Sequence, residues 1–256
     1  NIIFDNSISQ AKKLNDISKK RKLSKFNFGN LSSFIRILNI QKINNKKKIE
    51  FIMNNKNYSF ETTLIGNIQI KNLMFAIVAA YLSKVKIKNI LRSIKKIKPV
   101  SGRFEKIGNI RNKSNIILDY AHSPDALKTI ITNIKEDFPL SKISLVFGCG
   151  GNRDKDKRAI MGYVASKYCD SIYLTDDNPR LENPSLIRTQ IKKGLKKNKF
   201  VEIASRARAI SLAIKNLKSG DILIVAGKGH EIYQEYQKKY FFSNKLEILK
   251  AITKKN

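Results

Sequence analysis

Residues 221–231 read DILIVAGKGHE, in which an apolar run from Ile222 to Ala226 ends abruptly in glycines and charged side chains. A short run without polar alternation is typical of a strand buried on both faces of a parallel sheet. Three further apolar runs also end in polar clusters, near 116–118, 143–147 and 171–174. Ligands of open parallel sheets bind outside the carboxyl ends of the strands, so the four clusters are expected to share one crevice.

Helical segments alternate with these runs and predict an α/β domain with a mostly parallel sheet, from about residue 99 to 256. The expected helices cover 124–134, 157–168, 184–195 and 206–217, and one more strand is expected near 200–203. Residues 1–98 differ, because short alternating runs between 27 and 58 predict a small β meander. Helices are expected there at 72–82 and 88–97. A linker at Pro99–Gly102 would separate the two domains.

The net charge of +31 comes from 51 basic residues, of which 11 are arginines and 40 are lysines. Lysine spread evenly among asparagine and isoleucine indicates a compositional bias with solvated basic faces, and base-edge readers favour arginine. We therefore expect no nucleic-acid partner, although a basic nucleic-acid-binding protein stays open as an alternative. No apolar stretch reaches the roughly 18 residues of a membrane span, so no membrane partner is expected.

Two cysteines do not make a disulfide framework, and this fits a reducing cytoplasm. Together with the two histidines they lack the spacing of zinc ligands, so we expect no protein-bound metal.

A glycine-rich turn, Gly148-Cys149-Gly150-Gly151-Asn152-Arg153, follows the second apolar run. Glycines let backbone N–H groups approach an anion, and the guanidinium of Arg153 suits a carboxylate or a phosphate. A plain tight turn is the alternative interpretation.

The third run ends in Asp177-Asn178-Pro179-Arg180. Pro179 fixes its own φ angle and makes Asn178 extended, which would hold Asp177 and Arg180 in a stiff loop. One acid and one cation held this way suit a zwitterion, and the alternative is an internal ion pair. Glu231, in the motif that begins at Gly227, could hold a second ammonium group or act as an acid at a helix N-terminus.

Asp119 and His122 lie three residues apart after the first run, in DYAHSPD. They could hold the ribose and phosphate of a nucleotide, or cap the helix that begins near Pro124. We expect no nucleophilic dyad, because no serine or cysteine motif accompanies them. His122 is the residue that we assign as catalytic, on the nucleotide side.

Six segments resemble the Mur ligases of peptidoglycan synthesis, and they occur in the same order. They are Leu64–Asn72, Ser101–Glu105, Asp119–Asp125, the glycine turn, Asp177–Arg180 and Gly227–Gln234. The resemblance spans about 60–242 and implies a Rossmann-like C-terminal domain, preceded by the partial tail of a central ATPase domain. Within the family, Asp-Asn-Pro-Arg marks the members that add diaminopimelate, and lysine-adding members usually lack this arginine.

The resemblance implies a cytoplasmic ligase that forms an amide bond with ATP and Mg²⁺. ATP would phosphorylate the D-glutamate carboxylate of a UDP-N-acetylmuramoyl dipeptide, and an amine of meso-diaminopimelate would then attack the acyl phosphate. The implied diaminopimelate residues are Arg153, Asp177, Asn178, Pro179, Arg180, Gly227 and Glu231. The implied nucleotide-side residues are Asn72, Arg103, Asp119 and His122. Gln69 stands where the family often has asparagine, so the adenine contact is expected to differ.

The chain departs from the family at its front, because it contains no G-x-x-x-x-G-K-[ST] phosphate loop. It also lacks the stretch expected to carry the family's carbamoylated lysine. Residues 1–98 therefore resemble only part of the ATP-binding domain, and we expect this chain alone to be inactive. A lysine-adding ligase and a non-catalytic remnant that only binds a ligand or a partner remain alternatives. Free lysine has one carboxylate, so two arginines at the distal pocket favour diaminopimelate.

Overall fold

The computed structural model describes residues 1–44, 46–108, 110, 113–196 and 199–255. The chain falls into two units, Asn1–Lys98 and Pro99–Asn256. The division lies beside Pro99, where the sequence predicts a linker.

The first unit contains a sheet with the strand order β1-β2-β3-β4-β5. The sheet packs with α2 and α3 around one hydrophobic core. Its elements are β1 (Ile2–Asp5), α1 (Ala11–Lys20), β2 (Lys25–Phe28), β3 (Ile35–Ile43), β4 (Lys46–Met53), β5 (Lys56–Thr62), α2 (Asn67–Leu82) and α3 (Ile87–Ile94). The antiparallel strands β3, β4 and β5 form the expected meander. Asn54 and Asn55 both have positive φ angles, as a two-residue hairpin turn between β4 and β5 requires.

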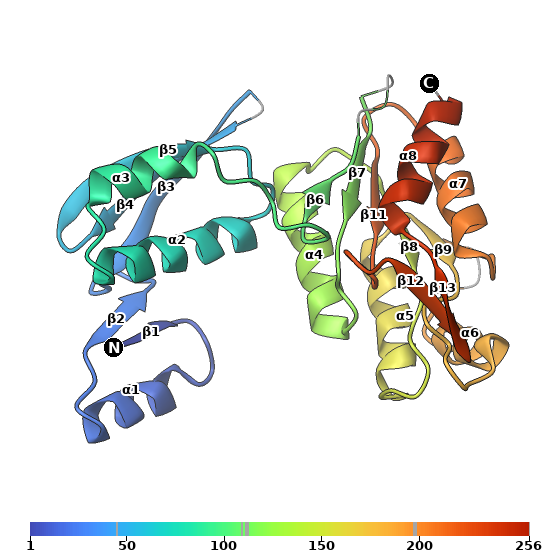
Figure 1. Cartoon of the computed structure of the whole chain (residues 1–256), viewed down its shortest axis with the longest axis horizontal. Helices are drawn as coiled ribbons and strands as arrows, with labels where there is room; N and C mark the ends of the chain where they lie inside the picture. The colour runs from blue at the N-terminus through green and yellow to red at the C-terminus, as the bar shows by residue number, and fades with distance from the viewer. Residues whose placement is uncertain (45, 109, 111–112, 197–198, 256) are drawn as a thin grey trace. The chain divides into compact units, whose positions relative to one another are not determined.

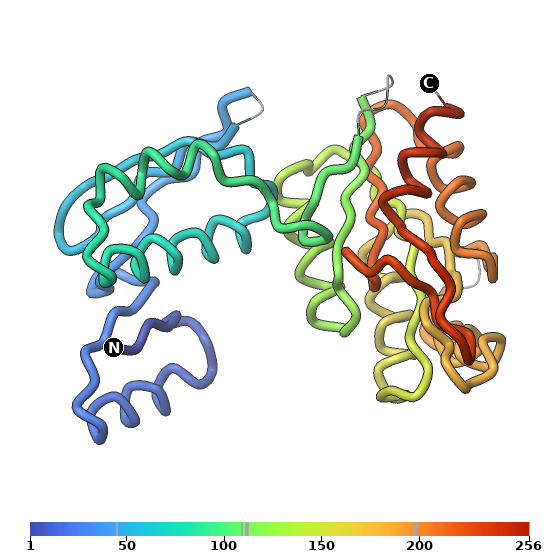
Figure 2. Tube along the Cα trace, in the orientation of Figure 1, coloured from blue at the N-terminus to red at the C-terminus, as the bar shows by residue number. Residues whose placement is uncertain are grey.

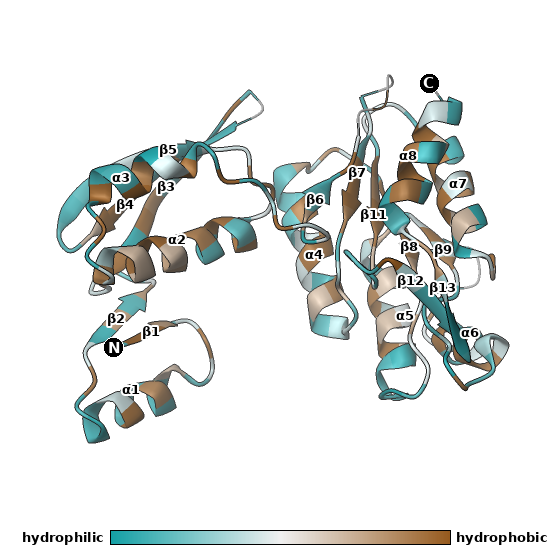
Figure 3. Ribbon diagram, viewed as in Figure 1, coloured by the Kyte–Doolittle hydropathy of each residue, from teal (hydrophilic) through white to brown (hydrophobic). Residues whose placement is uncertain are grey.

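The second unit is built on a sheet with the order β10-β9-β8-β11-β7-β6 (Figure 1). Its strands are β6 (Glu105–Lys106), β7 (Asn115–Leu118), β8 (Ile143–Phe147), β9 (Ser171–Leu174), β10 (Phe200–Glu202) and β11 (Ile222–Val225). All neighbouring pairs are parallel except β6 with β7. The expected mostly parallel α/β fold is therefore confirmed. Every residue of β11 is buried, and its apolar colouring is visible in Figure 3.

Helices cover both faces of this sheet, as the continuous trace in Figure 2 shows. They are α4 (Pro124–Asp137), α5 (Lys157–Tyr168), α6 (Pro184–Lys192), α7 (Arg206–Asn216) and α8 (Asn244–Lys255). α5 packs between α4 and α6, and α7 packs against α8. α6 ends three residues before the expected Leu195. At Gly194 a Cβ atom would lie 1.9 Å from the Ala159 carbonyl oxygen, so the glycine lets the chain after α6 pass close to α5.

A hairpin of β12 (Tyr233–Tyr236) and β13 (Lys238–Phe241) was not anticipated from the sequence. It attaches to the loop after β9 through a parallel bridge between Tyr236 and Arg180. No helix in the described residues is long and apolar enough to cross a membrane.

Candidate functional site

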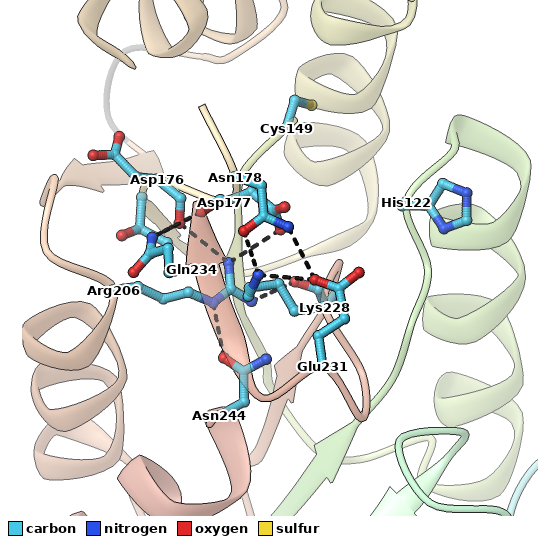
Figure 4. A network of polar contacts seen from close by, with 12 residues as sticks. His122, Cys149, Asp176, Asp177, Asn178, Arg206, Lys228, Glu231, Gln234 and Asn244 are labelled. Carbon is cyan, nitrogen blue, oxygen red and sulfur yellow. Dashed lines mark hydrogen bonds and ion pairs between the residues drawn. The ribbon is translucent and has the colours of Figure 1, made fainter. Parts of the chain in front are cut away.

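The polar clusters after β7, β8, β9 and β11 lie at one edge of the sheet, because these strands run parallel in register. Figure 4 shows the side chains from the loops after β9 and β11 pointing toward one another. The convergence expected from the sequence is therefore present.

The glycine turn after β8 packs directly on the loop after β9. A Cβ atom on Gly148 would lie 2.1 Å from the Thr175 carbonyl oxygen, and one on Gly151 would lie 1.9 Å from that of Pro179. The backbone N–H of Gly151 also donates to the Asn178 carbonyl at 2.9 Å. The glycines thus permit close contact between two loops, a role beyond the anion approach that the sequence suggested.

Arg158 supports the glycine turn from beneath. Its buried guanidinium donates to the Gly150 carbonyl at 3.0 Å and to both oxygens of Glu182, at 2.8 and 3.0 Å. Hydrogen bonds from Arg158, more than any other contact, lower the pKa of Glu182 to about 2.

Asp177 is buried at the centre of the edge. Its Oδ2 atom lies 3.7 Å from Nη1 of Arg206, which is also buried. Oδ2 is buried and has no hydrogen-bond partner among the described residues, so the charge of Arg206 is its main compensation. Gly227 lies against this carboxylate, because a Cβ at its φ of +110° would be 2.8 Å from Oδ2.

Arg206 joins three elements through its guanidinium (Figure 4). It donates to Oδ1 of Asn244 on α8 at 2.8 Å and to the Ala226 carbonyl after β11 at 2.7 Å. Burial lowers its pKa, whereas the nearby carboxylate of Asp177 acts in the opposite direction. Arg206 therefore ties α7 to the two loops that carry the predicted site.

Asn178, Lys228 and Glu231 form a second polar contact group in Figure 4. The Lys228 ammonium donates to Oδ1 of Asn178 at 2.6 Å and to Oε2 of Glu231 at 2.9 Å. Nδ2 of Asn178 donates to the same Oε2 atom at 3.0 Å. Burial lowers the pKa of Lys228, an effect that Asp177 and Glu231 oppose.

Arg180 adopts a left-handed backbone conformation, with φ at +55°. Its Nε atom lies 3.3 Å from Oε2 of Glu235, and its Nη1 atom donates to the Gly151 carbonyl at 2.8 Å. The hairpin thus fixes the guanidinium of Arg180 against the glycine turn.

Arg153 and Arg180 approach each other across Gly150. A Cβ atom at this glycine would lie 3.0 Å from Nη1 of Arg180 and 3.9 Å from Cγ of Arg153. Arg153 is exposed and donates to the Asn152 carbonyl at 3.4 Å. Both arginine side chains therefore pass close to Gly150.

The Tyr233 ring lies 5.1 Å from the Lys228 ammonium. The charge of Glu231 raises the pKa of Tyr233, and the charge of Arg180 opposes that rise. Because β8, β9 and β11 are parallel, Arg153, the loop 177–180, Gly227 and Glu231 all lie at the carboxyl ends of the strands.

Two residues assigned to the nucleotide side, Arg103 and His122, contact Tyr120. Its ring lies 4.6 Å from the Arg103 guanidinium and 4.8 Å from the His122 ring. In Figure 4, His122 lies apart from the Asp177–Lys228–Glu231 network. It is exposed, and its Nδ1 atom lies 2.9 Å from the Tyr120 carbonyl oxygen.

Asp119 accepts backbone N–H groups on both oxygens, from Phe104 at 2.9 Å and from Ala121 at 2.8 Å. Burial raises its pKa. A carboxylate has about four lone-pair sites, so each oxygen can still accept a hydroxyl. The exposed Arg103 could take a phosphate, and this donor set fits a nucleotide.

Asn72 lies in the other unit, on the exposed side of α2.

Sequence reasoning assigned no role to Arg206 or to the hairpin. One signal was available: Arg206 is the first residue of α7, where the helix dipole disfavours a cation, so it needs nearby acids. The hairpin's contacts with Arg180 had no local signal.

No group of three or more potential metal ligands was found among the described histidine, cysteine, aspartate and glutamate residues. Both cysteines are buried, and burial raises the pKa of each thiol to about 12. A thiol in that state is a poor nucleophile at neutral pH.

Comparison with known proteins identifies the family of this chain. Residues 102–229, half of the chain, match the family model described as Mur ligase, glutamate ligase domain. A UDP-N-acetylmuramoyl-L-alanyl-D-glutamate–2,6-diaminopimelate ligase of Rickettsia conorii is 47% identical over 201 residues, which are 77% of this chain and 41% of that protein. The Rickettsia bellii protein of the same name is 40% identical over 236 residues, which are 91% of this chain and 48% of that protein.

A solved structure with this ligase name superimposes with a TM-score of 0.67 at 26% identity. The match covers 98% of this chain and 53% of that one. The chain thus spans about half the length of the relatives it matches. Its sequence motifs, parallel sheet and strand-end loops agree with these matches, and the chain belongs to the Mur ligase family.

Proposed function

We propose that this chain is the amino-acid-binding part of a ligase that adds meso-diaminopimelate to UDP-N-acetylmuramoyl-L-alanyl-D-glutamate in peptidoglycan synthesis. The single observation that carries this proposal is the placement of charges at the strand ends. Nη1 of Arg180 and Cγ of Arg153 both lie within 4 Å of the Cβ position of Gly150, and Glu231 contacts Asn178 in the same Asp-Asn-Pro-Arg loop as Arg180. The names of the Rickettsia relatives support the choice of substrate.

The ligand's groups match this arrangement. Meso-diaminopimelate has two carboxylates and two ammonium groups, and guanidinium forks suit carboxylates. Arg153 and Arg180 would hold a carboxylate, with Pro179 and Gly227 shaping the wall. Glu231, whose side chain is 16% exposed, would take an ammonium group, and the charge of Asp177 would favour a cation nearby.

ATP would bind on the Tyr120 side, held by Arg103, Asp119 and His122. When bound, ATP supplies the phosphoryl group that activates the glutamate carboxylate as an acyl phosphate, and Mg²⁺ offsets the phosphate charge. The chain's own residues would orient the amine for attack. We place the reaction in the cytoplasm.

The phosphate loop and the residues that bind the UDP-linked dipeptide would belong to parts of a full ligase that these 256 residues do not contain. We expect the purified chain, given Mg·ATP, the UDP-linked dipeptide and meso-diaminopimelate, to release no phosphate above background. Diaminopimelate-dependent phosphate release would contradict this division of roles.

Direct binding tests the amino-acid assignment without requiring turnover. Isothermal titration of meso-diaminopimelate into the chain should give saturable binding with one site. L-lysine should bind more weakly, because it has no distal carboxylate for the arginines. Absence of diaminopimelate binding would overturn the proposal, and tighter binding of L-lysine would favour a lysine-adding ligase.

A further inference from the structure

Lys228 is fully buried, although it carries an ammonium group and follows a glycine in a surface-edge loop. Burying such a cation is costly unless it is paired and hydrogen-bonded. Its partners are Oδ1 of Asn178 and Oε2 of Glu231, and its ammonium lies 5.1 Å from the centre of the Tyr233 ring. The ammonium therefore joins the loop after β9 to the loop after β11.

This contact fixes which way the Asn178 amide faces. Its Oδ1 atom accepts from Lys228 at 2.6 Å and from the backbone N–H of Glu235 at 3.1 Å. With two donors on the oxygen, the amide nitrogen must point the other way, toward Glu231, where it donates at 3.0 Å. An amide without the Lys228 contact could turn its oxygen toward the Glu231 carboxylate, which would repel it.

The same contact fixes the Glu231 carboxylate. Oε2 receives the donors from Lys228 and Asn178, and Oε1 lies 3.4 Å from the Tyr120 hydroxyl, which donates to it. The Glu231 side chain is 16% exposed, so it remains accessible while both oxygens are held. A glutamate otherwise free to change rotamer is confined to one position.

We propose that Lys228 is a positioning residue that gives the site its preference for a ligand with two ammonium groups. It would act through Glu231 and Asn178 without touching the ligand. The inference rests on the proposed function, in which Glu231 takes one ammonium of the amino acid.

A ligand that lacks one ammonium separates this role from general support of the fold. 2-Aminopimelate keeps both carboxylates of diaminopimelate and has a single ammonium. Isothermal titration of each ligand into the native chain and into Lys228→Met measures the preference. Loss of one charge-assisted contact corresponds to roughly tenfold in affinity, so the native chain should prefer meso-diaminopimelate by about that factor.

In Lys228→Met, meso-diaminopimelate should bind about tenfold more weakly. The affinity for 2-aminopimelate, bound with its single ammonium away from Glu231, should change by less than about twofold. Lys228→Gln, which keeps a donor but no charge, should also lose preference and serves if the methionine variant does not fold. In the Glu231→Gln chain, adding Lys228→Met should change neither affinity further. Lys250→Met, on the exposed face of α8, is the matched control and should leave both affinities unchanged.

An equal loss of affinity for both ligands would overturn the inference, because it would indicate structural support alone. Tighter binding of meso-diaminopimelate would also overturn it, because Lys228 would then compete with the ligand for Glu231. If the native chain does not bind meso-diaminopimelate, the proposed function fails together with this inference. If native binding is present and Lys228→Met keeps the preference, the inference alone fails.

Discussion

The guanidinium of Arg206 lies 3.7 Å from Oδ2 of Asp177, and both side chains are almost completely shielded from water. The pair connects the start of α7 to the loop that follows β9. It therefore links the stability of the unit to the shape of the proposed site.

Replacing Arg206 with alanine should destabilise the second unit by about 3–5 kcal/mol, because Asp177 is left as a buried, uncompensated charge. The carbonyl of Ala226 and the amide oxygen of Asn244 also lose their donor. Urea unfolding would measure the change. Arg208→Ala on the exposed face of α7 is the control and should cost less than about 0.5 kcal/mol. Equal effects of the two variants would contradict this role.

Gly227→Ala should both destabilise the unit and weaken amino-acid binding. The φ of +110° disfavours any side chain, and the new Cβ would lie 2.8 Å from Oδ2 of Asp177. The expected cost in unfolding free energy is about 1–3 kcal/mol. Gly220→Ala is a matched control, because its φ is +78° but its Cβ would meet open space. Gly220→Ala should leave diaminopimelate affinity unchanged, and a similar loss in both variants would refute the contact with Asp177.

Glu182 should make stability depend on pH in the acidic range. Its pKa is lowered from 4.5 to about 2, so the ionised form is favoured by folding. The contribution is full above pH 4.5 and is lost as the pH falls toward 2, and partial exposure limits it to about 1–2 kcal/mol. The difference in unfolding free energy between native chain and Glu182→Gln should shrink as the pH is lowered. A difference that stays constant from pH 6 to pH 3 would show that the carboxylate charge is unimportant.

The buried cysteines should react slowly in the folded chain. Because burial raises the pKa of Cys149 and Cys169 to about 12, little thiolate is present at pH 8. Labelling with an aromatic disulfide reagent should be slow without denaturant and stoichiometric for two thiols in urea. Rapid labelling of one thiol in the native chain would reveal a reactive cysteine that the structure does not explain.

Much of the second unit could be predicted from the sequence, because its strands are short apolar runs. Ile222–Val225 is buried throughout, and a run of this kind has few other uses in an α/β chain. The placement of Asp177 and Glu231 at one edge followed from the parallel order of the strands. Chain direction alone brings those loops together.

The partners within the site could not be predicted in the same way. Lys228 and Asn178 are 50 residues apart, and a lysine next to a glycine reads as a solvated side chain until the loops are placed. The ion pair between Arg180 and Glu235 depends on a hairpin whose short strands have little periodicity. Long-range packing, which local patterns do not encode, decides both contacts.

The claim that the Asp177–Arg180 loop reads the distal end of a doubly zwitterionic amino acid depends most on Arg180. The decisive measurement is calorimetric titration of meso-diaminopimelate and L-lysine into the native chain, Arg180→Ala and Arg180→Lys. We predict that Arg180→Ala weakens meso-diaminopimelate binding by about 2–3 kcal/mol and leaves L-lysine binding nearly unchanged, with Arg180→Lys intermediate. Unchanged meso-diaminopimelate affinity in Arg180→Ala would contradict the account.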